Sequence, residues 1–210
     1  MYVPKHFGED DPAVLHTLMQ DYSFATLVST GHDAVPLATQ LPFVLDKQPA
    51  PFGTLRAHMA LGNPQWHTLV PEREVLVIFQ GPHTYITPSW YENPLSVPTW
   101  NYATVQAYGR SRLIEDHDAL YSHLRSLVEK HESRFVERWR LDSLPADYLT
   151  KMMKGVVGFE IEITRLTGKF KMSQNRGESE RERIVAELRD CQDDMVREVG
   201  RLVAGERDRG

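Results

Sequence analysis

Two short aromatic stretches lie close together in the middle of the chain, and their residue types suit a flat ligand. They are Ser89-Trp90-Tyr91 and Val97-Pro98-Thr99-Trp100-Asn101-Tyr102, and they hold two of the four Trp residues. Trp and Tyr bury large apolar faces, while their N–H or O–H group needs a polar partner. This chemistry predicts a site for a planar heteroaromatic ligand or a subunit interface, with ordinary core aromatics as the alternative.

A basic run follows near the end of the chain. Residues 163–177 contain no acid and hold Arg165, Lys169, Lys171 and Arg176. Because the net charge of the whole chain is -5, such a local positive run is a candidate anion site. The alternative is a solvated strand face.

No catalytic motif accompanies these residues. The chain lacks the glycine patterns of phosphate loops, dinucleotide sites and hydrolase elbows. The His residues are scattered, and we expect surface or capping roles rather than metal binding for His67, His83, His117, His123 and His131. Acidic neighbours are expected to keep the Cys191 thiol protonated. The sequence therefore predicts no metal site and leaves open whether the protein is an enzyme.

Charge and cysteine content limit the classes of protein. Twenty-four Lys and Arg residues face twenty-nine Asp and Glu residues, which argues against a broad nucleic-acid-binding face. A single cysteine excludes an internal disulfide and favours a reducing cytoplasm. Because the longest apolar run is Val75–Phe79, we also expect a soluble protein with no membrane segment or signal peptide.

The periodicity of apolar residues predicts short strands and helices in alternation. Helices are expected at 11–21, after Asn63-Pro64 and after Asp116, and a long or broken amphipathic helix at 178–204, with a frayed end at 205–210. Strands are expected at 24–29, 36–45, 52–58, 75–79, 103–114, 159–164 and 168–173, of which 75–79 is expected to be fully buried. This pattern predicts a mainly β fold with flanking helices (α+β), built as a largely antiparallel barrel.

Several motifs in order along the chain resemble one family. They are Met1-Tyr2-Val3-Pro4-Lys5-His6-Phe7, Gly53-Thr54-Leu55-Arg56-Ala57-His58, Asn63-Pro64-Gln65-Trp66, Phe79-Gln80-Gly81-Pro82, the two aromatic stretches and Lys171-Met172-Ser173-Gln174-Asn175-Arg176. In these residues the chain resembles the FMN-binding negative transcriptional regulators of the PaiB type, over residues 1 to about 190. The resemblance implies a split β-barrel similar to pyridoxamine-phosphate oxidase, a homodimer, and an FMN site where two barrels meet.

For that site, the resemblance points to residues able to hold a phosphate and a ring system. Arg56 and His58 lie two apart on one predicted strand face, beside the helix start at Asn63. A surface ion pair is the alternative for Arg56, and a core position for His58. The other candidate cofactor-binding residues are Thr39, Gln40, Trp100, Asn101, Tyr102, Lys171, Gln174 and Asn175. Gln65 is expected to decorate its helix.

The chain departs from the family pattern at two places. Thr39-Gln40 stands where members usually carry an Asn or His pair, and Leu61 stands where they usually carry an Arg. If both missing cations touched the phosphate, FMN affinity would fall by a few kcal/mol, since a charge-assisted hydrogen bond contributes roughly 1.5 to 3 kcal/mol.

The sequence thus predicts a split-barrel domain over 1–175 and a C-terminal helical extension over 176–210 packed on the barrel or on a partner subunit. The expected function is FMN binding by a negative transcriptional regulator. The alternatives are an FMN-dependent oxidoreductase acting on a small molecule, or a dimeric module that is cofactor-free or binds haem. Direct DNA binding is doubtful, because 176–210 carries eight Arg among ten acids.

Overall fold

The computed structural model describes residues 1–31, 33–49, 51–93 and 95–206. It divides into two compact units. Unit 1 comprises Met1–Leu18, Gln80–Val105 and Thr167–Gly210, and unit 2 comprises Met19–Phe79 and Gln106–Leu166. The part of the predicted frayed end at 207–210 lies outside the described residues. Within the described residues, no helix is long and apolar enough to cross a membrane.

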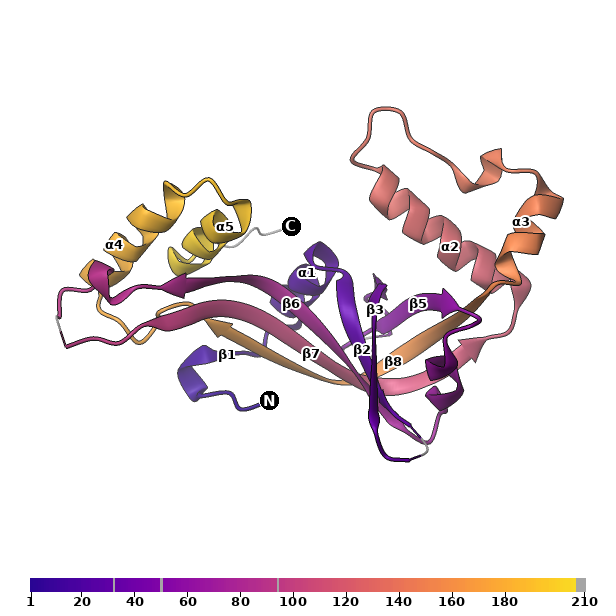
Figure 1. Cartoon of the computed structure of the whole chain (residues 1–210), viewed down its shortest axis with the longest axis horizontal. Helices are drawn as coiled ribbons and strands as arrows, with labels where there is room; N and C mark the ends of the chain where they lie inside the picture. Colours follow the sequence, from indigo (N-terminus) through magenta and orange to yellow (C-terminus); the bar gives the residue numbers. More distant parts are fainter. Residues whose placement is uncertain (32, 50, 94, 207–210) are drawn as a thin grey trace. The chain divides into compact units, whose positions relative to one another are not determined.

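Unit 2 holds most of an antiparallel sheet (Figure 1). Its own strands are β2 (Phe24–Thr30), β3 (Pro36–Pro42), β4 (Val44–Asp46) and β5 (Thr54–Ala60). Three long strands run through both units, namely β6 (Glu74–Ile86), β7 (Thr99–Ile114) and β8 (Val156–Lys171). The strand order is β3-β2-β6-β7-β8-β5-β4. This confirms the predicted mainly β fold with flanking helices.

Phe43 separates the two strands at the ends of this order. β3 and β4 are consecutive in the chain, and Phe43 lies between them with only 1% of its surface exposed. Its ring centroid lies 5.9 Å from that of Phe79 and 6.4 Å from that of Phe159. Burying this aromatic cluster inside the curved sheet offsets the loss of strand pairing at the break. The predicted single strand at 36–45 is therefore wrong, and the barrel is split rather than closed.

A helical segment covers part of the outer face of the sheet in unit 2. α2 (His117–Glu132) begins after Asp116, whose side chain accepts the Ala119 N–H at 2.7 Å, as predicted. Gly158 on β8 makes room for this helix, because a Cβ atom there would lie 2.6 Å from Leu120 Cδ1. η4 (Leu141–Ser143) and α3 (Ala146–Met153) follow. The sequence analysis did not predict α3.

The short helix after Asn63 is a 3-10 helix, η2 (Pro64–Thr68). The Asn63 side chain accepts the Gln65 N–H at 3.0 Å, and Pro64 occupies the first helical position. The predicted cap and proline signal is confirmed. Leu61 lies on the exposed turn just before it, and its carbonyl accepts the Trp66 Nε1–H at 3.1 Å.

The long strands differ from the predicted ones in length and burial. β8 was expected as two strands separated by a turn, but it is continuous over 16 residues. Its buried positions change from odd numbers at Phe159 and Ile161 to even numbers at Gly168 and Phe170, which implies an extra residue in the ladder, a β-bulge. β6 alternates between buried and half-buried residues from 75 to 79, so the expectation of full burial there is wrong.

Unit 1 carries the remaining elements. η1 (Lys5–Phe7) leads into β1 (Gly8–Glu9), which pairs with β8 so that Gly8 faces Lys169. α1 (Pro12–Asp21) begins in unit 1, where Leu15 packs over Gly168, and its bounds match the prediction. η3 (Pro88–Trp90) follows the end of β6.

The C-terminal stretch forms two helices rather than one. α4 (Glu178–Arg189) and α5 (Asp194–Val203) lie side by side, because Asp193 caps a new helix and turns the chain (Figure 1). A Cβ at Gly200 would lie 3.1 Å from Leu188 Cβ, so the two helices pack closely there. An ion pair of 3.1 Å between Arg183 and Glu92 fastens α4 to the segment after η3.

Candidate functional site

One face of the sheet in unit 1 brings together aromatic rings and lysines. Trp100 and Tyr102 alternate on β7 with the buried Asn101 and Ala103, so they share the outward face. Their neighbours on β8 are Lys169 and Lys171, which alternate in the same way with buried residues. The candidate aromatic and cationic residues of the sequence analysis therefore meet on one surface, which we call the aromatic–lysine face: Trp100, Tyr102, Lys169 and Lys171.

Lys171 is the more enclosed of the two lysines. Its ammonium donates a hydrogen bond to Thr99 Oγ1 and lies 6.0 Å from the centre of the Phe7 ring. Burial is the main cause that lowers the pKa of Lys171, and the charge of Lys169 lowers it further, while Tyr102 raises it. An anion bound here would relieve both costs, because it would replace lost water and compensate two positive charges.

Lys169 lies between two tyrosine rings. Its ammonium is 5.2 Å from the centre of the Tyr102 ring and 5.8 Å from that of Tyr2, and it donates to the Tyr2 carbonyl at 3.2 Å. Cation–π contacts of this kind hold a lysine in place without neutralising it. Among the described residues, no carboxylate lies within ion-pair distance of Lys169 or Lys171. The face therefore carries two uncompensated positive charges.

Trp100 leaves a large apolar surface open. Its ring is 52% exposed, with His83 at 6.1 Å and Tyr85 at 6.2 Å between ring centres. Tyr85 is itself 46% exposed. Aromatic surface of this size is normally covered, either by a ligand or by another protein surface.

Asn101 faces the opposite way. It is fully buried, and its Nδ2 donates to Ser173 Oγ at 2.9 Å across to the chain that follows β8. Ser173 has a left-handed backbone with φ of 58°, so this bond holds a sharp bend in place. The structure therefore separates Asn101 from Trp100 and Tyr102, because neighbouring residues on a strand point to opposite faces.

The two polar residues after this bend differ in their surroundings. Gln174 folds back on its own strand end, where its Oε1 accepts the Met172 N–H at 2.6 Å and its Nε2 donates to the Phe170 carbonyl at 2.5 Å. Asn175 is exposed. Gln174 thus supports the backbone beside Lys171.

In unit 2, Arg56 takes part in a chain of ion pairs. It lies on β5, 3.6 Å from Asp46 and 3.4 Å from Glu160, and Glu160 also pairs with Arg112. These residues face one another because the strand register places Arg56 opposite Glu160 and opposite Val44, two residues before Asp46. Two guanidinium groups and two carboxylates balance, so this cluster resembles the ion-pair alternative for Arg56.

His58 shares the outward face of β5 with Arg56, as predicted, and is covered by α2. Its Nδ1 lies 3.1 Å from Nε2 of His123, and the two rings meet edge to face with centres 5.3 Å apart. Burial lowers the pKa of His58, and it lowers the pKa of His123 to about 4 with help from the charges of His58 and Arg56. His123 was expected at the surface, and that prediction is wrong, because only 3% of it is exposed.

Thr39 and Asn63 belong to a hydrogen-bonded network centred on Gln65. Asn63 Nδ2 donates to Thr39 Oγ1 at 3.1 Å, and Thr39 Oγ1 donates to Gln65 Oε1 at 2.5 Å. Gln65 Nε2 donates in turn to Ser29 Oγ at 3.0 Å and to the carbonyls of Leu27 and Leu37. Gln65 is only 2% exposed, so it ties η2 to β2 and β3 rather than decorating its helix. Gln40, the next residue after Thr39, points outward and is exposed.

Sequence reasoning overlooked four residues of these clusters. Lys169 was noted only as part of a basic run, and its alternation with Phe170 could have placed it beside Lys171. Tyr2, Gln65 and His123 gave no such signal, because their roles depend on partners far away in the chain.

With this geometry in place, the comparisons with known proteins become informative. Residues 1–165 match the family described as "Putative FMN-binding domain". The chain belongs to this FMN-binding family. The match ends at Arg165, just before the part of β8 that carries Lys169 and Lys171.

A curated relative of this FMN-binding protein extends further. The "Protease synthase and sporulation protein PAI 2" of Bacillus subtilis is 35% identical over 203 residues, which cover 97% of this chain and 96% of the relative. The resemblance to PaiB-type proteins is therefore confirmed along nearly the whole chain.

Solved structures confirm the split-barrel fold. A conserved hypothetical protein of Mycobacterium tuberculosis, Rv2991, has a TM-score of 0.59 at 13% identity and covers 85% of this chain and 95% of its own. The flavocytochrome Anf3 of Azotobacter vinelandii has a TM-score of 0.56 at 14% identity and covers 80% of this chain and 72% of its own. At these identities the likeness concerns the fold alone.

Proposed function

We propose that the protein binds FMN on the aromatic–lysine face and acts as a negative regulator of gene expression. The observation that carries the binding proposal is the pair of lysines without carboxylate partners beside open aromatic rings. Two ammonium groups suit a phosphate monoester, which carries close to two negative charges at neutral pH. The family to which the chain belongs supports a flavin as the molecule that carries this phosphate.

Each group on the face has a separate task in this proposal. Lys171 and Lys169 hold the phosphate, with Thr99 keeping the Lys171 ammonium in position. Trp100 and Tyr102 offer ring surfaces to the isoalloxazine, because flat aromatic systems pack well on one another. When bound, FMN supplies redox chemistry or, in a regulator, a redox-sensitive ligand.

We assign a different role to the candidate residues of unit 2. Arg56, His58, Thr39 and Asn63 each have partners inside the unit, so their main contribution is to hold β5, α2 and η2 in place. Any contact of Arg56 with a phosphate would have to compete with Asp46 and Glu160. We therefore expect Lys171 to contribute more to FMN affinity than Arg56.

A homodimer completes the proposal. Trp100 and Tyr85 leave about half of their surfaces exposed, and a second copy of the chain would cover them together with the flavin. The regulatory role rests on the name of the Bacillus subtilis relative, which concerns sporulation and protease synthesis. Because the chain has a net charge of -5, we propose that regulation in the cytoplasm proceeds without a broad DNA-binding surface.

The test is a titration of the purified protein with FMN, followed by flavin fluorescence. We expect binding in the micromolar range or tighter, and weaker binding of riboflavin, which has the same ring but no phosphate. Equal affinities for the two flavins would refute the phosphate site. Adding NAD(P)H to the loaded protein then separates the alternatives, since steady oxidation of NAD(P)H would favour an oxidoreductase over a regulator.

A further inference from the structure

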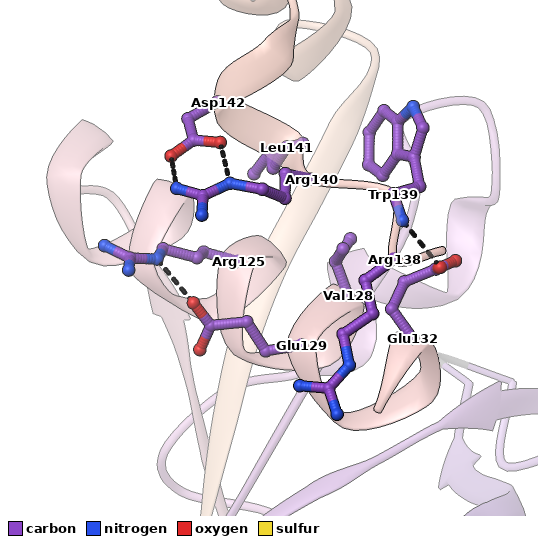
Figure 2. A pocket seen from close by; sticks show the side chains of 9 residues that line it. All are labelled: Arg125, Val128, Glu129, Glu132, Arg138, Trp139, Arg140, Leu141 and Asp142. Atoms are coloured by element: carbon purple, nitrogen blue, oxygen red, sulfur yellow. Dashed lines mark hydrogen bonds and ion pairs between the residues drawn. The ribbon is translucent and has the colours of Figure 1, made fainter. Parts of the chain in front are cut away.

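A second candidate binding site lies in unit 2, well defined by one short stretch of chain. A cavity of about 450 Å³ separates one face of α2 from the segment that returns after it (Figure 2). Its α2 wall consists of Arg125, Val128, Glu129 and Glu132, whose spacing places them on one side of the helix. The opposite wall consists of residues 138–142. The volume falls within the range of about 300–1,000 Å³ that is typical of small-molecule sites.

The two walls are fixed by contacts that need no ligand. Glu132 Oε2 accepts the backbone N–H of Trp139 at 2.9 Å, which fastens the returning segment to the last turn of α2. Arg140 holds Asp142 through two hydrogen bonds of 2.9 and 2.6 Å, as Figure 2 shows. A site built in advance loses less free energy on binding than one that must be ordered.

Arg138 differs from the other two arginines of the cavity. Arg125 pairs with Glu129 at 2.7 Å, and Arg140 pairs with Asp142. No carboxylate of the described residues lies within ion-pair distance of Arg138. Its guanidinium therefore keeps a free, flat set of donors, the arrangement that recognises a carboxylate with two hydrogen bonds.

Apolar surface lies beside this free cation. Trp139 is 45% exposed although its ring is large, and the buried Leu141 and half-buried Val128 also line the cavity. The three acids of the lining would repel a phosphate dianion more strongly than a single carboxylate. A ligand with one negative charge and an apolar body satisfies both the cation and the indole.

We propose that this cavity binds a small carboxylic acid with an aromatic body, held by Arg138 at its carboxylate and by Trp139 at its ring. The site is separate from the aromatic–lysine face in its residues, and the proposal does not depend on FMN binding.

Isothermal titration with phenylacetate tests this assignment. We expect phenylacetate to bind at least about tenfold more tightly than phenylacetamide, which has the same shape without the charge, or than acetate, which lacks the ring. Arg138→Gln is expected to weaken phenylacetate binding about tenfold or more. The matched control is Arg134→Gln, because Arg134 belongs to the same segment but stacks on Phe135 and does not line the cavity.

Three results would overturn the proposal. One is the absence of a binding signal up to about 10 mM phenylacetate, a concentration at which even weak sites fill. Another is an equal effect of Arg138→Gln and Arg134→Gln. The third is loss of phenylacetate binding in Lys171→Ala but not in Arg138→Gln, which would place the acid on the aromatic–lysine face. Circular dichroism of each variant shows that the fold is retained.

Discussion

His58 Nδ1 and His123 Nε2 lie 3.1 Å apart, and this contact joins α2 to the outer face of β5. One ring must donate the single hydrogen between them, so at least one imidazole is neutral. His123 Nδ1 is buried and has no hydrogen-bond partner. The charged groups nearest the pair belong to the Arg56 cluster, which adds positive charge beside it. The contact therefore depends on the two rings staying unprotonated.

We expect the free energy of unfolding to fall below neutral pH because of this pair. Both pKa values are lowered in the folded protein, that of His123 from 6.5 to about 4, so the unfolded chain binds more protons in this interval. The stabilisation is complete above about pH 6.5 and is lost as the pH falls toward 4, by up to about 3 kcal/mol. Urea unfolding at pH 7.5 and pH 5 measures the difference.

A matched pair of variants separates this effect from general acid sensitivity. His123→Leu is expected to destabilise the protein at pH 7.5 and to reduce the difference between the two pH values. His117→Gln changes an exposed His at the start of the same helix and should leave that difference as it was. If both variants keep the wild-type pH dependence, the pair is not its source.

Lysine substitutions are expected to weaken FMN binding and spare riboflavin binding. Lys171→Ala and Lys169→Ala each remove one ammonium from the aromatic–lysine face, at a cost of about 1.5–3 kcal/mol, or about tenfold to a hundredfold in affinity. Riboflavin lacks the phosphate, so its affinity should change by less than about threefold. Fluorescence titration gives both numbers, and Lys151→Ala on α3 is the control.

Asn101→Ala is expected to lower stability and leave flavin affinity almost unchanged. The side chain is fully buried and bonded to Ser173, so its loss leaves a buried hydroxyl with a weaker partner, at about 1–3 kcal/mol. Thermal unfolding and FMN titration are measured on the same sample. The exposed Asn175→Ala is the control, and a tenfold loss of FMN affinity without loss of stability in Asn101→Ala would contradict this role.

Gly109→Ala is expected to disrupt the pairing of β7 with β8. A Cβ there would lie 2.3 Å from the Glu162 carbonyl oxygen and 2.6 Å from Ile161 Cγ2, so a backbone atom would have to move. We expect a cost of about 3 kcal/mol or more, measured by urea unfolding. Gly62→Ala is the control, because no atom lies within 4 Å of the added carbon. Equal stabilities of the two variants would show that the strands are less closely packed.

The sequence alone determined those features that depend on neighbours along the chain. Alternation placed Trp100 with Tyr102 and Lys169 with Lys171, because strand residues two apart share a face. The Asn63-Pro64 and Asp116 signals gave two helix starts for the same local reason, since a cap needs only the next few residues. The family motifs were enough to predict the FMN-binding family and the split barrel.

Only the tertiary structure decided which of these residues are free to bind anything. Arg56 and Lys171 look alike in the sequence as isolated cations on strands, yet Arg56 faces Glu160 across 104 positions of chain, and Lys171 faces Thr99 and Phe7 instead of a carboxylate. His123 is buried because β5 brings His58 under α2. Whether a charge is compensated depends on partners that folding brings together, and no local pattern encodes them.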